Sequence, residues 1–301
     1  MTDSNQATPV IQTIALCRYC GVTPRMFGAL LAHFGNLERV IRADSGTLMA
    51  ISGIGVETTN RIATASEQLA AAEEHFNQSA ARDITIVSRL DETYPRRLFE
   101  LNDPPSLLYV RGMIPDNETR MVALVGGENA TNDGIELTVK LARRFTAEGV
   151  SVVSSLNAGI DAAAHLGIRA ENGTSFAVLE AGFDQIHPAE NAPLAVDILK
   201  SGGLISEYAP DAEFKEDNYC QSNRLIAGLT QAVVITELYQ GSMRTLDLLN
   251  CCSQIGKLVF VMIDPELGAL ADQASLNDAV ANGAIPIIGL DRVDDIIKSL
   301  V

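Results

Sequence analysis

The chain has 301 residues, with 38 acidic against 22 basic side chains and a formal net charge of −16. Hydrophobic residues make up 47%, which excludes global disorder and is enough to bury a core in one large domain or a few smaller ones. The apolar runs are too short for a membrane span and the five cysteines form no disulfide framework, so we expect a cytoplasmic protein. The acid excess argues against a generic nucleic-acid binder, which usually carries a basic excess.

Residues 1–80 predict a small all-helical domain. The segment is rich in Ala, Leu and Met, and turn signals interrupt it at 21–24, 44–46 and 52–55. Thr23 is a candidate N-cap, with Pro24 at the first helical position.

Residues 81–120 predict a connecting segment packed on the sheet that follows. Short strands are expected over 84–87 and 107–110. The prolines at 95, 104 and 105 exclude helix around them, because proline fixes φ and restricts the residue before it.

Residues 121–301 predict a Rossmann-like, doubly wound α/β domain with a mostly parallel sheet. Apolar strands alternate here with helices such as 135–148 and 243–254, a pattern typical of parallel sheets covered on both faces. The expected strands are 121–125, 150–153, 175–179, 204–205, 232–235, 258–262 and 284–287.

The turns after these strands carry the residues that are suited to bind a ligand. Glycines and hydroxyl residues follow the strands at 126–131, 154–161 and 241–245. Glu180 directly follows the strand at 175–179, and Glu237 comes after the strand at 232–235. Free amides at helix N-termini bind phosphate, so these turns predict a phosphate site at the carboxyl edge of the sheet. Neither a strict dinucleotide fingerprint nor a Walker motif occurs.

The motifs run in an order that resembles the Smf/DprA family, the DNA-processing protein A proteins of bacteria. The matching residues cover nearly the whole chain: Tyr94-Pro95 with Leu98, Asp103-Pro104-Pro105, Leu108–Gly112, Val125-Gly126 with Thr131 and Gly134, Gly159-Ile160-Asp161 with Ala164-His165, Asn223–Leu229, and Glu237 with Gly241-Ser242 and Thr245. The helical segment from Phe34-Gly35 to Gly53-Ile54-Gly55 is similar to the family's SAM-like, helix-hairpin-helix segment.

The resemblance implies a homodimeric protein that binds single-stranded DNA and helps load a RecA-type recombinase during natural transformation, without enzymatic activity, cofactor or metal. Asp161 and His165 are then interpreted as ordering a turn rather than as an acid–base pair. The expected DNA-phosphate residues are Gly126, Gly127, Thr131, Ser154, Gly159, Ile160, Asp161, Asn223, Arg224, Gly241, Ser242, Arg244 and Thr245.

The chain departs from the family pattern at positions that would carry positive charge. Glu128 and Ser222 stand where the family has arginines, and Gln240 replaces a serine. Residues 1–80 and 81–120 have net charges of −2 and −1, whereas 121–301, with eleven basic and 24 acidic residues, has −13. The expected DNA-binding domain is therefore the most acidic part of the chain, a disadvantage for contact with phosphates.

Two alternatives to DNA binding remain open from the sequence. One is a nucleotide-ligand binder or phosphoribohydrolase of the wider SLOG superfamily, in which Glu237, the turn at 241–245 and Glu128 would act on the nucleotide. The other is an adaptor that kept the fold and a protein partner but lost the ligand.

Overall fold

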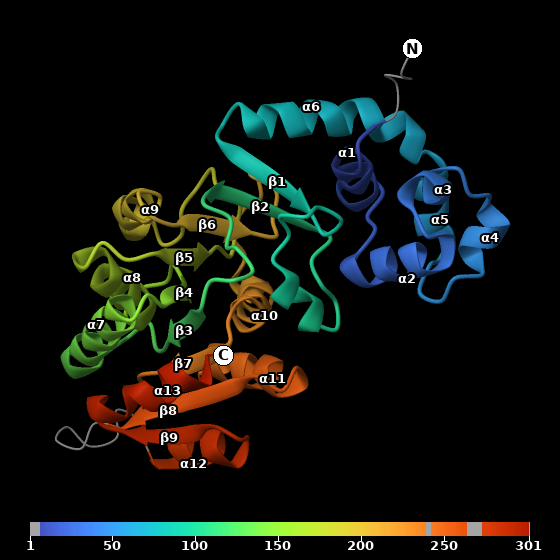
Figure 1. Cartoon of the computed structure of the whole chain (residues 1–301). Helices are drawn as coiled ribbons and strands as arrows, with labels where there is room; N and C mark the ends of the chain where they lie inside the picture. Colours follow the sequence, from blue (N-terminus) through green and yellow to red (C-terminus); the bar gives the residue numbers. More distant parts are fainter. Residues whose placement is uncertain (1–6, 239–241, 264–272, 301) are drawn as a thin grey trace. The chain divides into compact units, whose positions relative to one another are not determined.

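The computed structural model describes residues 7–238, 242–263 and 273–300 (Figure 1). The chain forms two compact units, the first from residues 1–94 and 102–109 and the second from 95–101 and 110–301. The predicted connecting segment, 81–120, is thus divided between the two units.

The first unit is helical as far as Ala80, and its helices pack around a small apolar core. Thr23 caps α2 by accepting a hydrogen bond from the amide of Met26 (3.3 Å), which confirms the predicted cap, and Gly35 ends the helix with a left-handed backbone (φ 78°). Phe27 and Ile62 lie in the core. The helical elements are α1 (Pro9–Ile14), a π-helical turn (Ala15–Tyr19), α2 (Pro24–Phe34), α3 (Leu37–Ile41), α4 (Ser45–Met49), α5 (Val56–Ala63), a 3-10 turn (Ala65–Gln68) and α6 (Leu69–Ala80).

Two strands follow α6 along the chain, where the sequence predicts them. They are β1 (Ile84–Ser88) and β2 (Leu107–Gly112), with a 3-10 turn (Arg96–Glu100) between them in sequence.

All seven strands predicted beyond residue 120 are present, and they pair in parallel in the second unit. The central strands at 121–125 and 232–235 are apolar and fully buried because helices cover both faces of the sheet there, whereas the edge strand at 285–288 is largely exposed. The strands are β3 (Met121–Val125), β4 (Ser151–Ser155), β5 (Ser175–Val178), β6 (Gly203–Ser206), β7 (Ala232–Ile235), β8 (Leu258–Ile263) and β9 (Ile285–Ile288).

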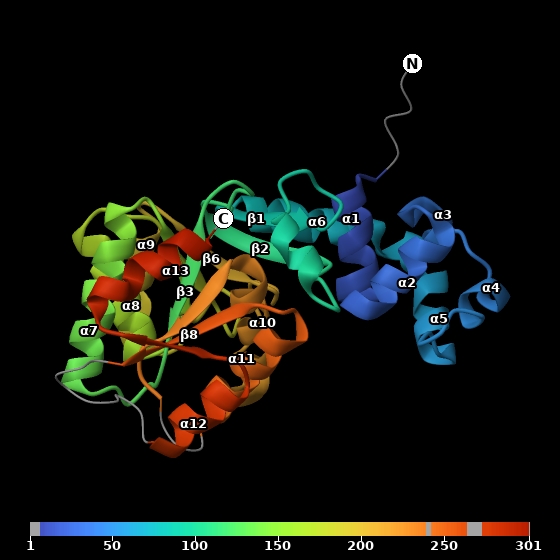
Figure 2. The same ribbon diagram turned by 60° about the horizontal axis from the view of Figure 1, so that its bottom comes forward.

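Helices cover both faces of this sheet, as Figure 2 shows. The helices are α7 (Asn132–Ala147), α8 (Ile160–Ala170), α9 (Ala192–Ile198), α10 (Tyr219–Leu229), α11 (Met243–Gln254), α12 (Gln273–Ala281) and α13 (Val293–Ser299), with 3-10 turns at Ala189–Asn191, Glu216–Asn218 and Leu290–Arg292. One face of the sheet packs on α7, α8 and α13 around a core that includes Phe145 and Val234, and the other carries α10 and α11.

The strand order places a ligand crevice beside β3. In the second unit the order is β6-β5-β4-β3-β7-β8-β9, so the chain builds outward from β3 in one direction and then, from β7, in the other. Ligands of open α/β sheets bind outside the carboxyl ends of the strands at such a reversal.

No helix in the described part of the chain is both long and apolar enough to cross a membrane.

Candidate functional site

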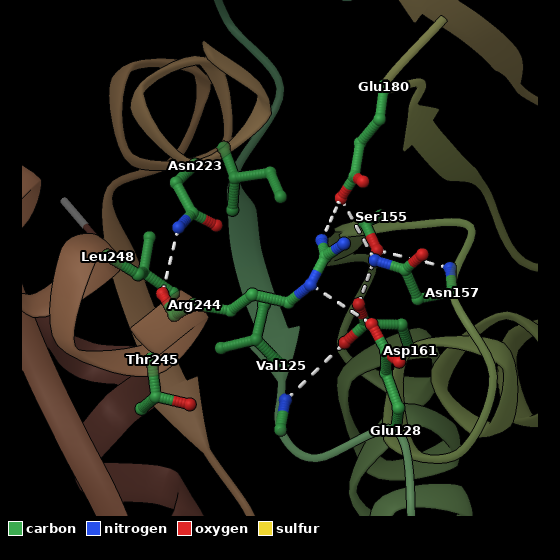
Figure 3. A pocket seen from close by; sticks show the side chains of 12 residues that line it. Val125, Glu128, Ser155, Asn157, Asp161, Glu180, Asn223, Arg244, Thr245 and Leu248 are labelled. Carbon is green, nitrogen blue, oxygen red and sulfur yellow. Dashed lines mark hydrogen bonds and ion pairs between the residues drawn. The ribbon is translucent and has the colours of Figure 1, made fainter. Parts of the chain in front are cut away.

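The loops after β3, β4 and β5, together with α10 and α11, line a small cavity of about 30 Å³ in the second unit (Figure 3). Five predicted phosphate-site residues line it: Gly126, Asp161, Asn223, Arg244 and Thr245. The other lining residues are Val125, Glu128, Ser155, Asn157, Glu180, Ile226 and Leu248.

Glycines bring the loops after β3 and β4 together. A Cβ at Gly159 (φ 72°) would collide with the carbonyl oxygens of Gly127 and Glu128, and one at Gly126 would collide with the buried side chain of Ile160. The amide of Ile160 donates to the carbonyl of Gly127 (3.2 Å). Gly127, Gly159 and Ile160 therefore hold the two loops together beside the cavity lining, and this amide at the start of α8 is already used internally.

Arg244, on the first turn of α11, is the cation of the cavity. Its Nε lies 3.0 Å from Oε1 of Glu128, its Nη1 donates to Oε1 of Glu180, and its guanidinium carbon stands 4.9 Å from the ring centre of Tyr219. Burial acts to lower the pKa of Arg244, but the hydrogen bond and charge of Glu180 and the charge of Glu128 outweigh it and raise the pKa above its usual value. Arg244 is thus a fixed positive charge held between two carboxylates.

Asn223 positions the segment that carries Arg244. Its side-chain amide donates to the backbone carbonyl of Arg244 (2.8 Å) and to Oδ2 of Asp247 (2.9 Å), which joins α10 to α11. Thr245 lines the cavity, but its amide donates to the capping oxygen of Ser242 (3.3 Å). Ser242 is therefore the N-cap of α11.

Arg224 lies away from the cavity lining. It is buried, its Nε donates to Oε1 of Gln221 (2.6 Å), and its Nη2 pairs with Glu207. The structure thus separates the two predicted arginines: Arg244 faces the cavity and Arg224 stabilises the surroundings of α10.

Thr131 and Ser154 also serve the fold around the site. Thr131 caps α7 by accepting from the amide of Gly134 (3.0 Å), and its own amide donates to both carboxylate oxygens of Glu237 (3.2 and 3.1 Å). The hydroxyl of Ser154 donates to the carbonyl of Leu124 (2.6 Å). Glu237 is buried and its carboxylate faces the N-terminal turn of α7, where the helix dipole favours negative charge.

Asp161 and His165 are both buried at the start of α8, and burial shifts both groups toward their neutral forms. Burial raises the pKa of Asp161 to about 7, with the charge of Glu180 adding to the rise and a hydrogen bond from Ser155 opposing it. Burial lowers the pKa of His165 to about 4. The Nε2 of His165 lies 2.9 Å from the carbonyl oxygen of Ser155, so this ring orders the turn.

Glu180, the buried carboxylate partner of Arg244, was not predicted as a site residue from the sequence. Glu180 accepts hydrogen bonds from Asn157 (3.0 Å) and Ser222 (3.4 Å) in addition to Arg244. The signal was its position directly after the predicted strand 175–179, at the edge of the sheet where ligands of open α/β sheets bind. The one remaining predicted site residue, Gly241, lies outside the described residues.

The cavity is acidic despite its arginine. Glu128, Asp161 and Glu180 line it against the single guanidinium of Arg244 among its lining side chains. Within the described ranges no cluster of three or more His, Cys, Asp or Glu side chains is arranged to hold a metal ion.

The fold and the site define a class: a Rossmann-like protein with a ligand cavity at the strand reversal of its sheet. The profile of the family described as DNA recombination-mediator protein A matches residues 63–300. The chain belongs to this family, the Smf/DprA proteins.

Known relatives support this assignment. The chain is 32% identical over 241 residues to protein Smf of Synechocystis sp., an alignment covering 79% of this chain and 59% of that protein. It is 29% identical over 214 residues to the DNA processing protein DprA of Bacillus subtilis, covering 71% of this chain and 67% of that one. The aligned region is thus about three fifths of the Synechocystis protein.

Solved structures share the fold. The DNA processing protein A of Streptococcus pneumoniae superposes with a TM-score of 0.77 at 24% identity, covering 94% of this chain and 97% of that one. The single-stranded DNA-binding DNA processing protein A of Helicobacter pylori superposes with a TM-score of 0.61 at 22% identity, covering 71% and 96%.

Proposed function

We propose that the chain binds single-stranded DNA at the carboxyl edge of its parallel sheet, with Arg244 holding a backbone phosphate. One observation carries the proposal: Arg244 stands in a small cavity at the strand reversal, and one of its two carboxylate partners, Glu128, is about half exposed. Family membership supports it, as does the single-stranded DNA binding described for the DNA processing protein A of Helicobacter pylori.

We further propose that the chain binds DNA without cleaving it and assists a RecA-type recombinase as a homodimer, in the cytoplasm during DNA uptake. The burial of His165 and its hydrogen bond to the Ser155 carbonyl support a binding role, because a general base must reach its substrate. The family description as a recombination mediator supports the partner. Co-precipitation with a purified RecA-type recombinase and sedimentation velocity test the partner and the dimer.

The geometry favours DNA binding over the nucleotide-hydrolase alternative. That alternative places Glu237 at the reaction, with Glu128 as a replacement acid. The carboxylate of Glu237 accepts the amide of Thr131 and the residue is 3% exposed. Glu128 lines the cavity, but its carboxylate is paired with Arg244. Glu237 also lies outside the cavity lining.

Fluorescence anisotropy with a labelled oligo-dT tests the proposal. We expect binding at low salt that weakens as salt rises, because each phosphate contact releases counterions. Arg244→Ala is expected to weaken binding about tenfold, from the loss of one partly buried phosphate contact. Arg143→Ala is the charge-matched control on exposed α7, where Arg143 pairs with Glu171 (3.5 Å), and should change the Kd less than about twofold.

Absence of binding at low salt, or an equal loss in the two variants, would contradict the proposal. A panel of nucleotides in a thermal-shift assay separates the alternative ligand class: we expect no stabilisation by free nucleotides beyond that given by inorganic phosphate.

A further inference from the structure

Arg244 is held by two carboxylates that differ sharply in exposure. The side chain of Glu180 is 6% exposed, whereas that of Glu128 is 48% exposed and reaches the guanidinium from the loop after β3 (Figure 3). Both carboxylates point at Arg244 from opposite sides of the cavity.

Glu180 is the permanent partner. Asn157 and Ser222 also donate to its Oε1, and a buried carboxylate that lost its cation would bear an uncompensated desolvation cost. Within the described residues no group donates to its Oε2, so the buried carboxylate of Glu180 depends all the more on Arg244 to balance its negative charge.

Glu128 is the exchangeable partner. Its carboxylate can turn into water from its half-exposed position, and an exposed ion pair contributes little net free energy. A carboxylate and a phosphodiester offer a guanidinium the same pair of anionic oxygens. One anion can therefore replace the other on Arg244 without changing the net charge around it.

We infer that Glu128 is a competing internal ligand that occupies the phosphate position on Arg244 and must leave before a DNA phosphate can bind. This inference rests on the proposed DNA-binding function and assigns the competition to one side chain. If Glu128 stayed, three anions (Glu128, Glu180 and the phosphate) would surround one guanidinium. Glu128 thus competes with the phosphate for Arg244 and weakens phosphate binding at this cavity.

The test compares Glu128→Gln with Glu136→Gln by oligo-dT anisotropy at low salt. Glu136, on α7 outside the cavity lining, forms an exposed pair with Lys140 (2.7 Å), so its substitution makes the same charge change and also releases a cation. We expect Glu128→Gln to lower the Kd about fivefold and Glu136→Gln to lower it less than twofold. In the double variant Glu128→Gln/Arg244→Ala the gain should disappear.

Each outcome decides one proposal. Wild-type binding with equal Kd values for the two glutamine variants overturns the role of Glu128 and leaves the proposed function standing. A gain that survives in the double variant with Arg244→Ala also overturns it. If neither the wild type nor Glu128→Gln binds DNA, the proposed function fails and this inference fails with it. Circular dichroism should be unchanged in both single variants, because the side chain of Glu136 is exposed and that of Glu128 is about half exposed.

Discussion

Asp161 and His165 make opposite contributions to stability in the same pH range. The pKa of Asp161 is raised from 3.8 to about 7, so its stabilising contribution is present below pH 4 and is lost as pH rises through 7. The pKa of His165 is lowered from 6.5 to about 4, so its contribution is present above pH 6.5 and is lost as pH falls through 4. Between about pH 4 and 6.5 the two changes offset each other.

Removing either group should expose the titration of the other. We expect the free energy of unfolding of Asp161→Asn to rise relative to that of the wild type as pH rises from 4 to 7. The difference between the two should change by up to about 1.4 kcal/mol per pH unit. His165→Gln should show the opposite trend: its free energy of unfolding should fall relative to that of the wild type as pH rises from 4 to 6.5. Urea unfolding across this range measures the differences, in which the other carboxylates cancel.

Parallel pH profiles for the wild type and both variants would show that these groups titrate normally. If the free energy of unfolding of Asp161→Asn fell relative to that of the wild type as pH rises, the pKa of Asp161 would be lowered in the folded protein rather than raised.

At the scale of elements, the start of α8 fits against the loop after β3 only because residue 159 is glycine. Its positive φ and the close carbonyls of Gly127 and Glu128 both exclude a side chain. Gly149, after α7, has a similar φ of 67° but no neighbouring atom within 4 Å of an added Cβ.

Gly159→Ala and Gly149→Ala separate backbone strain from collision. We expect Gly149→Ala to destabilise by about 1 kcal/mol, the cost of a left-handed backbone with a side chain. Gly159→Ala should cost at least about 3 kcal/mol, because overpacking adds to the strain. The midpoints of urea unfolding followed by circular dichroism measure both, and equal midpoints would show that the two loops can separate freely.

The elements were largely predictable from local sequence, and the pairing of side chains at the site was not. Strand runs such as 232–235, and the Thr23-Pro24 helix start, follow from short-range patterns of burial and capping. The parallel order also follows, because helices separate the strands. The partners of Arg244 lie 64 and 116 residues away in the chain, and only the folded loops show that both reach the same guanidinium.

The same reason explains Arg224. Motif order alone placed it with the phosphate residues, but the register of α10 turns it toward Glu207 and Gln221. The neighbouring residue Asn223 points instead at α11, since residues adjacent on a helix face different directions.

For the whole molecule, the excess of acidic residues extends into the cavity itself. The net charge of −13 over residues 121–301 does not spare the site, because Glu128, Glu180 and Asp161 line it with Arg244. Exposed bases such as Lys140 and Arg144 pair with acids on the surface. The DNA binding that we propose for this unit would therefore depend on a local exchange at Arg244 rather than on a broad basic surface.

A crystal structure of the chain with a short oligo-dT is the sharpest test of phosphate exchange at Arg244. We expect a backbone phosphate within about 3 Å of the Arg244 guanidinium, with Glu128 turned away and Glu180 still in place. A bound oligonucleotide held elsewhere, with Glu128 and Glu180 both remaining on Arg244, would contradict it.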